Sequence, residues 1–227
     1  MRWVNNGDNL GLIPSPPLQR QHGGAKHEVE ASSTIGLHMF SVAQQDITHL
    51  ADYRPVTIDE LADVRILHET AFRALAANQH GAGEIDAFCA LMQSNAYTDQ
   101  IAGNDLWAAW IERTLIGTAG WAPVDGFGRS ARIADVFVNP LFAGRGFGRV
   151  LAMAAEERAR LAGFNAFGVR VTPNAVPFFA SLGYRITAQG TRQLPGGIDL
   201  PVTYMRKQRR KRLPGDGGGA DTPDQAR

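Results

Sequence analysis

The sequence has one cysteine, three lysines and six histidines among its 227 residues, and each scarcity excludes a class of chemistry. The single cysteine, Cys89, cannot form an internal disulfide or a thiolate metal site, so we expect a reducing, cytoplasmic location and no metal. No lysine lies within 52–205, the span that we expect to fold, which excludes a P-loop site and Schiff-base chemistry there. Every histidine lies at or before His80 and no G-x-S-x-G segment is present, so a serine hydrolase is not expected.

Long apolar runs are also missing. No stretch reaches the roughly 18 consecutive apolar residues that a membrane-spanning helix needs, so we expect no membrane association. A hydrophobic content of 44% with 20% charged residues is instead typical of a globular domain with a sizeable core.

Charge and breaker residues divide the chain into three parts. Residues 51–206 are expected to form the domain, and 52–205 hold 13 Arg against 15 Asp and Glu, a net charge of −2. The following residues, 207–227, are basic and then glycine-rich, which predicts a disordered tail. Only this tail could attract nucleic acid, so a nucleic-acid-binding function is not favoured. Residues 1–50, in which prolines and glycines interrupt any periodicity, are expected to be a poorly ordered extension, with Met39 as a candidate natural start.

Hydrophobic periodicity within this span predicts a mixed α/β domain. The expected elements are a strand at 54–56, helices at 58–77 and 85–92, a β-hairpin of 106–111 and 115–121, a strand at 133–138, a helix at 147–162, a strand at 167–171, a short helix at 176–182 and strands at 184–189 and 202–205.

Three alternating glycines, Gly144, Gly146 and Gly148, lie between an expected strand and an expected helix. Glycine lets the backbone turn tightly and approach a ligand closely, and a helix N-terminus attracts anions. Arg145 and Arg149 lie at the same end, where the helix dipole disfavours cations, so a multiply charged anion would explain them. The third glycine comes one position too early for the dinucleotide fingerprint, so we favour a pyrophosphate bound in another way; a purely structural turn is the alternative.

Three segments together resemble the GNAT (Gcn5-related N-acetyltransferase) superfamily. Residues 136–140 followed by 144–148 look like its acyl-CoA-binding segment, and 174–184 resembles its second signature, a short helix ending at a Gly-aromatic pair. Arg54-Pro55 before a long helix ending at Ala71-Phe72 is similar to the opening segment of the family. The resemblance covers nearly the whole expected domain in the correct order.

The resemblance implies a single α/β domain whose mixed, mostly antiparallel sheet is splayed between the strands at 133–138 and 167–171 and is flanked by helices. Acetyl-CoA would be the cosubstrate and would lie in that splay. Backbone groups of the first strand would pair with the pantetheine arm, the glycine turn would hold the pyrophosphate, and an asparagine would bind the arm near the second signature. The implied cofactor-binding residues are Phe137, Val138, Gly144, Arg145, Gly146, Phe147, Gly148, Arg149 and Asn174.

The implied activity is transfer of an acetyl group to a primary amine of a small molecule or peptide by direct attack. Two positions depart from the family pattern: Ala143 stands where Gln or Arg is usual, and Phe179 stands where a tyrosine often protonates the departing thiolate. Ser181, Tyr184 or Tyr204 could supply that proton instead. The loss of the acid favours an alternative, an acyl-CoA-binding sensor with little turnover.

A general base must take the proton of the acceptor ammonium. Asp135, on the strand at 133–138, is the first candidate, and Glu112, at the end of the hairpin strand, is the second. The acceptor itself is not readable, because the regions 58–105 and 190–200, from which the family builds that site, contain no recognisable constellation. Oligomeric state, a homodimer included, is left open.

Overall fold

The computed structural model describes residues 46–124 and 130–208. Most of the predicted N-terminal extension, with the candidate start at Met39, and nearly all of the predicted basic tail lie outside the described residues. Those expectations stay predictions. The last described strand continues to Gln208, just past the predicted end of the domain.

Seven strands form one sheet in the order β1-β2-β3-β4-β5-β7-β6. All neighbouring pairs are antiparallel except β4 and β5, which are parallel, and this confirms the mixed, mostly antiparallel sheet. The strands are β1 (Asp52–Pro55), β2 (Asp105–Ile111), β3 (Thr114–Pro123), β4 (Ser130–Val138), β5 (Ala166–Val171), β6 (Arg185–Gln193) and β7 (Asp199–Gln208).

The two parallel strands part after a short stretch. β4 and β5 are in register from Ser130 and Ala166 to Arg132 and Gly168, and the described residues hold no register pair between them beyond that point. The predicted splay is therefore confirmed. Because each strand there is paired on one side only, its backbone N–H and C=O groups on the other side face the opening.

Five α-helices accompany the sheet: α1 (Leu61–Ala76), α2 (Ala82–Met92), α3 (Asn95–Ala102), α4 (Phe147–Leu161) and α5 (Val176–Ser181). The sequence pattern missed α3. Its eight residues bury only Tyr97 and Ile101, too few apolar positions to reveal a period, and its N-cap Ser94 accepts a hydrogen bond from the Tyr97 N–H at 3.2 Å. Single 3₁₀ turns complete the chain at Thr48–Leu50, Ile58–Glu60, Pro140–Phe142, Pro173–Ala175 and Pro195–Gly197.

The start of α1 is fixed to the sheet by a short network. The expected capping box of Thr57 and Glu60 is present, with the Thr57 N–H donating to Glu60 Oε2 at 2.9 Å. The Arg54 guanidinium of β1 donates two hydrogen bonds to the same carboxylate, at 2.6 and 3.0 Å, and these contacts lower the pKa of Glu60 to about 2. The beginning of α1 is therefore held against the first strand.

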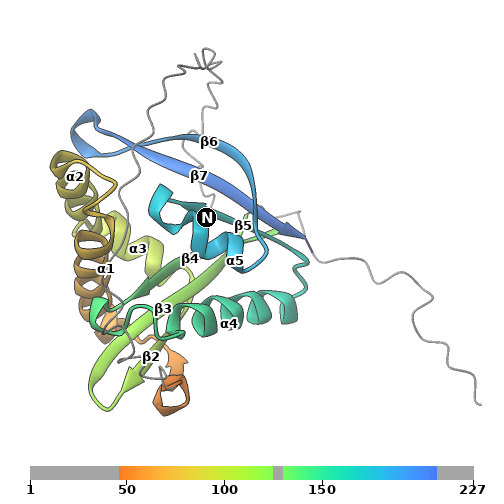
Figure 1. Cartoon of the computed structure of the whole chain (residues 1–227). Helices are drawn as coiled ribbons and strands as arrows, with labels where there is room; N and C mark the ends of the chain where they lie inside the picture. The colour runs from red at the N-terminus through yellow and green to blue at the C-terminus, as the bar shows by residue number, and fades with distance from the viewer. Residues whose placement is uncertain (1–45, 125–129, 209–227) are drawn as a thin grey trace, which may run out of the picture. The chain divides into compact units, whose positions relative to one another are not determined.

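Two hydrophobic cores lie on the two faces of the sheet, as the layers in Figure 1 show. The first packs α4 and α5 against β3, β4 and β5, with Phe147 and Leu151 at its centre. The second packs α1, α2 and α3 against β2 and the start of β7, through residues such as Val64, Met92 and Leu200. The splay between β4 and β5 is therefore covered by helices on both faces.

Candidate functional site

A cavity of about 440 Å³ lies at the splay. One wall is the second half of β4 and the other is the end of β5 with the start of α5, while α1 and α2 contribute apolar side chains. The lining residues are mostly apolar, so the few polar groups among them determine what the cavity can bind. The polar lining side chains are Asp135, Arg170, Thr172 and Asn174.

The free edge of β4 provides backbone groups along one wall. The Asn139 N–H donates to the Ile116 C=O of β3 at 2.8 Å, which fixes the side of the strand that faces β3. Backbone direction alternates along a strand, so Phe137 also faces β3, whereas the N–H and C=O of Val138 face the cavity. The register therefore favours Val138, and not Phe137, for the predicted backbone pairing with a ligand.

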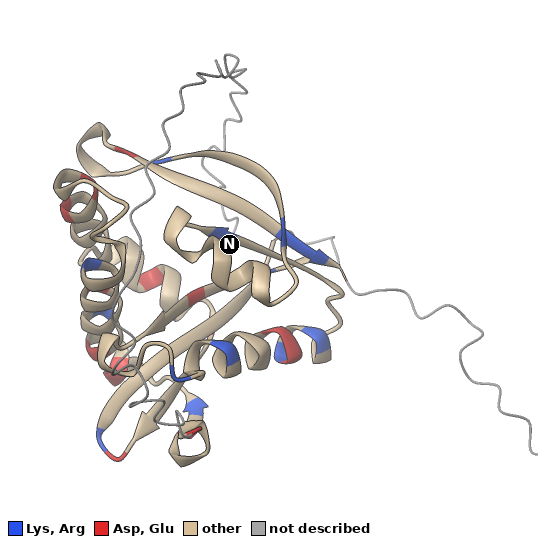
Figure 2. Cartoon of the chain, viewed as in Figure 1, with Lys and Arg blue, Asp and Glu red and all other residues tan. Residues whose placement is uncertain are grey.

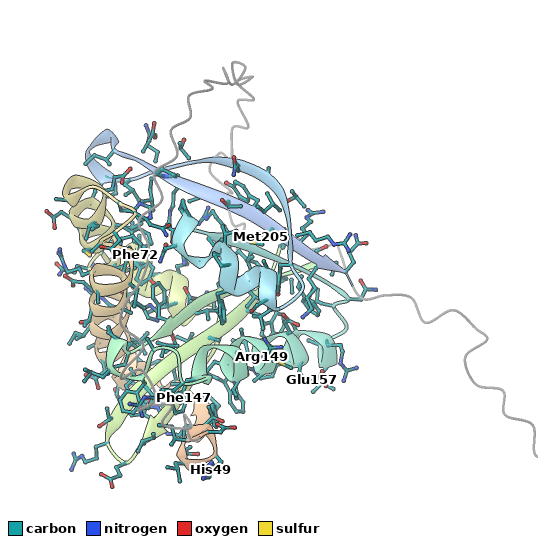
Figure 3. All side chains as sticks on the ribbon, viewed as in Figure 1. His49, Phe72, Phe147, Arg149, Glu157 and Met205 are labelled. Carbon is teal, nitrogen blue, oxygen red and sulfur yellow. The ribbon has the colours of Figure 1, made fainter. Side chains whose placement is uncertain are left out.

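The glycine turn leads directly into α4. Gly144 and Gly146 have φ of 76° and 92°, a left-handed conformation in which other residues are strained. Phe147 is fully buried and fixes the first turn of the helix in the core (Figure 3). The N–H groups of this first turn have no acceptor within the helix and remain available to an anion.

Two details refine the expected anion site. The Arg145 N–H donates to the Phe142 C=O at 3.4 Å, so this N–H contributes to the turn itself. The side chains of Arg145 and Arg149 are exposed on either side of the helix start, and Figure 3 labels Arg149 there. Ala143 is exposed as well.

Gly148 lines the cavity and admits no side chain without a shift of its neighbours. A Cβ atom at this position would lie 3.3 Å from Val138 Cγ2 and 3.5 Å from the Phe178 ring. The absent side chain keeps the passage between β4 and α5 open, as a ligand lying along β4 would require.

Asn174 lies on the opposite wall, where β5 leads into α5. Its Nδ2 donates to the Leu75 C=O of α1 at 3.3 Å, and its Oδ1 accepts from the Thr172 hydroxyl at 2.6 Å. Asn174 thus joins α1 to the β5–α5 connection across the cavity. It is one of the lining residues. The role that the family resemblance implies for it, binding of the pantetheine arm, stays a prediction.

Asp135 occupies an irregular point of β4. The register between β3 and β4 shifts between Thr118 and Gly120, and Asp135 opposite this shift has a φ of 56°. Its Oδ2 accepts a hydrogen bond from Asn104 Nδ2 at 2.5 Å, while its C=O accepts one from the Thr118 hydroxyl at 2.7 Å. Burial raises the pKa of the Asp135 carboxyl, and the Asn104 hydrogen bond opposes this. The result is a carboxyl group that lines the cavity and has an increased proton affinity.

The buried side chains of His68, Tyr97 and Thr118 form a cluster next to this position, and no local sequence pattern predicted it. His68 of α1 contacts the Thr118 hydroxyl through Nε2 and the Tyr97 hydroxyl through Nδ1, both at 2.8 Å. Its ring stacks on Phe137 with centroids 4.2 Å apart. Burial lowers the pKa of His68 to about 3, so the imidazole is neutral at physiological pH. His68 and Tyr97 are separated by 29 residues, which hides the cluster from local pattern analysis.

Glu112, the second candidate base, lies elsewhere. It is exposed in the two-residue turn between β2 and β3, with a φ of 53°, and it does not line the cavity. The tight hairpin that the sequence predicted places this residue at the turn, where its side chain reaches solvent. The structure therefore does not bring Glu112 together with Asp135.

Phe179 lines the cavity, and the three proposed substitutes for a tyrosine there do not. The Ser181 hydroxyl donates to the Phe178 C=O at 2.7 Å and is exposed. Tyr184 is buried in the core beside Phe179, their ring centroids 5.4 Å apart. Tyr204, on β7, is the register partner of Arg170 and so lies on the same face of the sheet as that lining residue.

Neither a membrane span nor a metal-binding cluster occurs within residues 46–124 and 130–208. Within these ranges no helix combines the length and the apolarity that crossing a bilayer requires. Nor do the same ranges bring together three His, Cys, Asp or Glu side chains in a group that could hold a metal ion.

Comparison with known proteins identifies the fold and the family. The model of the acetyltransferase (GNAT) domain matches residues 76–208, more than half of the chain. A search of curated protein sequences finds no match. A solved GCN5-related N-acetyltransferase from Rhodopseudomonas palustris aligns with a TM-score of 0.63 at 23% identity, covering 70% of this chain and 96% of that one.

Two other solved structures share the fold at lower identity. The PaiA N-acetyltransferase of Thermoplasma acidophilum, solved with coenzyme A, has a TM-score of 0.54 at 16% identity and covers 70% of this chain and 99% of its own. A GNAT phosphinothricin acetyltransferase of Sinorhizobium meliloti, solved with acetyl-CoA, has a TM-score of 0.51 at 16% identity, covering 70% of this chain and 88% of its own. With its splayed sheet and glycine turn, the chain belongs to the GNAT acetyltransferase family.

Proposed function

We propose that this chain is an acetyl-CoA-dependent N-acetyltransferase that acetylates a primary amine of a small molecule or peptide. The observation that carries the proposal is the cavity at the splay, where the free edge of β4 and the glycine turn meet a partly buried carboxyl group. The family assignment and the coenzyme A or acetyl-CoA bound in two of the similar structures support it.

The residues present fit acetyl-CoA. Val138 offers backbone groups for the pantetheine arm, the first turn of α4 after Gly146 offers N–H groups for the pyrophosphate, and Gly148 leaves the passage open. Arg145 and Arg149 add positive charge at the same point. Bound acetyl-CoA would supply a thioester whose carbonyl carbon an amine can attack.

Asp135 is the proposed general base. In the reaction the amine nitrogen bonds to the acetyl carbonyl carbon, the carbon–sulfur bond breaks, and the thiolate leaves with the electron pair. Asp135 would take the proton that the ammonium group must lose, directly or through water, and the raised pKa of its carboxyl suits that task. Its hydrogen bond to Asn104 and the bond from Thr118 to its C=O hold it in place.

A sensor that binds acyl-CoA with little turnover is the second candidate. Phe179 favours it, because this lining residue has no proton for the departing thiolate, and neither Ser181 nor Tyr184 lines the cavity. A thiol with a pKa near 8.5 is nevertheless a tolerable leaving group without an acid. The cofactor site would be the same in both cases.

Thermal unfolding with and without acetyl-CoA tests the cofactor site. A ligand at 100 times its Kd stabilises the native state by about 2.7 kcal/mol, which corresponds to a rise in Tm of roughly 5–10 °C for a domain of this size. We expect this rise in the wild type and its loss in Gly146→Glu, which places a carboxylate in the turn.

Gly163→Glu is the matched control. Gly163, just after the other end of α4, has a φ of 99°, close to the 92° of Gly146, and an added Cβ there meets no atom within 4 Å. Both variants therefore carry the same backbone strain, and only Gly146→Glu should lose the response. A wild type unaffected by millimolar acetyl-CoA would contradict the proposal, and so would a full response in Gly146→Glu.

A further inference from the structure

The side of the cavity that faces α1 and α2, here called the second subsite, has arginines beside it on one face of the sheet. Strands β4, β5 and β6 carry few charged residues (Figure 2). They are Arg132 and Asp135 on β4, Arg170 on β5, and Arg185 and Arg192 on β6. Register partners share a face of a sheet, and so do residues two or four apart along one strand.

This rule places three of these arginines together. Arg170 pairs with Tyr204 of β7, and Arg192 pairs with Leu200, four residues earlier on the same strand. Arg132 pairs with Gly168, two residues before Arg170. All three side chains therefore lie on the face that carries Leu200, which packs in the core with α1 and α2.

Two of these arginines are close to the cavity, and none of the three has a carboxylate partner among the described residues. Arg170 lines the cavity, and the Arg192 guanidinium lies 5.5 Å from the ring centroid of Phe88, another lining residue. Burial and then the charge of Arg170 lower the pKa of Arg192 to about 10. Within the described ranges, ion pairs engage Arg54, Arg73, Arg158 and Arg160, and none engages Arg132, Arg170 or Arg192.

Asp135 is the acid whose charge acts on this cluster, and it balances one of three positive charges. A half-buried arginine without a carboxylate is costly, and a bidentate anion would remove that cost. The remaining wall of the subsite is apolar, formed by Phe72, Leu75 and Phe88. Together these groups suit a ligand with one carboxylate, one ammonium group and an apolar side chain.

We propose that the acceptor is a free α-amino acid with an apolar side chain, its carboxylate bound by Arg170 and Arg192 and its amine facing Asp135. This inference rests on the proposed function and specifies the substrate class of the same site. Phe72, Leu75 and Phe88 would contact the side chain of the amino acid.

Release of CoA thiol from acetyl-CoA tests the inference with matched acceptors. L-Phenylalanine and L-leucine are compared with their amides and with the amines that lack the carboxyl group, 2-phenylethylamine and 3-methylbutylamine. We expect kcat/KM to be at least about tenfold higher for one or both acids than for its amide and amine, because only the acids offer an anion to the arginines.

Variants assign the effect to the arginines. Arg192→Gln and Arg170→Gln should raise the KM of the acid about tenfold, leave the KM of acetyl-CoA unchanged and have little effect on the amide. Arg185→Gln, on the same strand as Arg192 but exposed, should change none of these values. Tm measurements confirm that each variant is folded.

Three results would overturn the inference while leaving the proposed function intact. They are equal or better use of the amides or amines, an unchanged KM for the acid in both arginine variants, and a protein that is stabilised by acetyl-CoA yet acetylates neither acid. A protein that acetyl-CoA does not stabilise would instead contradict the proposed function, which separates the two failures.

Discussion

On the β4–α4 side of the cavity, the groups offered to a ligand belong to the backbone, whereas on the α1–β5–β6 side they belong to side chains. The proposed cofactor side consists of the free edge of β4 and the turn from Gly144 to Gly148. The proposed acceptor side consists of Asp135, Arg170 and Arg192. The neutral His68 is linked to Asp135 through the Thr118 hydroxyl. Backbone groups suit a cofactor shared by a whole family, and side chains can change with the acceptor.

The comparison predicts that substitutions on one side leave the function of the other unchanged. Asp135→Asn should give the largest effect, a loss of about 10³ in kcat, because it removes the proposed general base. The affinity for acetyl-CoA should not change. Asparagine tolerates the left-handed φ of 56° at this position, so backbone strain does not complicate the result.

The stability of Asp135→Asn distinguishes a lost base from a damaged fold. Burial raises the pKa of Asp135 above its value in the unfolded chain. The free energy of unfolding therefore falls as pH rises from the unfolded pKa through the folded one, because the folded protein must ionise a disfavoured carboxylate. Asn carries no such cost, and Tm at pH 7 should be equal to or higher than that of the wild type. The acidic limb of the kcat/KM profile should lie above the ordinary pKa of an aspartate in the wild type and disappear in the variant. A normal rate in Asp135→Asn, with exposed Asp99→Asn as control, would assign the base elsewhere.

Gly148→Val should weaken acetyl-CoA binding by about 10- to 100-fold, measured by calorimetry, because its side chain would overpack against Val138 and Phe178. Gly83 is the matched control, since it is also the second residue of its helix and has no atom within 4 Å of an added Cβ. Gly83→Val should bind acetyl-CoA normally. Equal affinity in the two variants would show that the ligand does not pass between β4 and α5.

His68 should make the stability of the domain depend on pH. Burial lowers its pKa to about 3, below the unfolded value near 6.5, so its contribution is present above pH 6.5 and lost as pH falls toward 3. Between pH 7.5 and pH 5 the loss amounts to roughly 2 kcal/mol of unfolding free energy. Denaturant unfolding should show this component in the wild type and in exposed His49→Gln, and not in His68→Gln (Figure 3). If the same pH-dependent loss of unfolding free energy persisted in His68→Gln, this account of the His68 cluster would be contradicted.

Phe179→Tyr should give the smallest effect, a few-fold rise in kcat with unchanged acetyl-CoA affinity. The new hydroxyl would offer a proton to a leaving group that already departs without one. Phe178→Tyr, at another lining position, is the control and should not raise kcat. A fall in kcat for a stable Phe179→Tyr would show that the apolar ring itself is needed.

The same comparison explains how much the sequence alone could predict. Local periodicity predicted most helices and strands, and the three glycines predicted the turn before α4. The splay and the candidate roles of Asn174 and Asp135 came from the family resemblance alone. The acceptor side was not predicted, since Arg170 and Arg192 become neighbours only through two register pairings with β7, and His68 meets Tyr97 and Thr118 only in the folded core. Glu112 lies in the β2–β3 turn and not among the residues that line the cavity, because hairpin strands alone do not show where the turn points.

The most direct test of acetyl transfer is amine-dependent release of CoA thiol from acetyl-CoA at neutral pH, measured over free amino acids, simple primary amines and short peptides. The account predicts that at least one acceptor raises the rate well above the amine-free rate, with loss of the increase in Asp135→Asn. If acetyl-CoA stabilises the protein but none of these acceptors speeds thiol release, the result would contradict the proposed N-acetyltransferase activity and favour the acyl-CoA sensor.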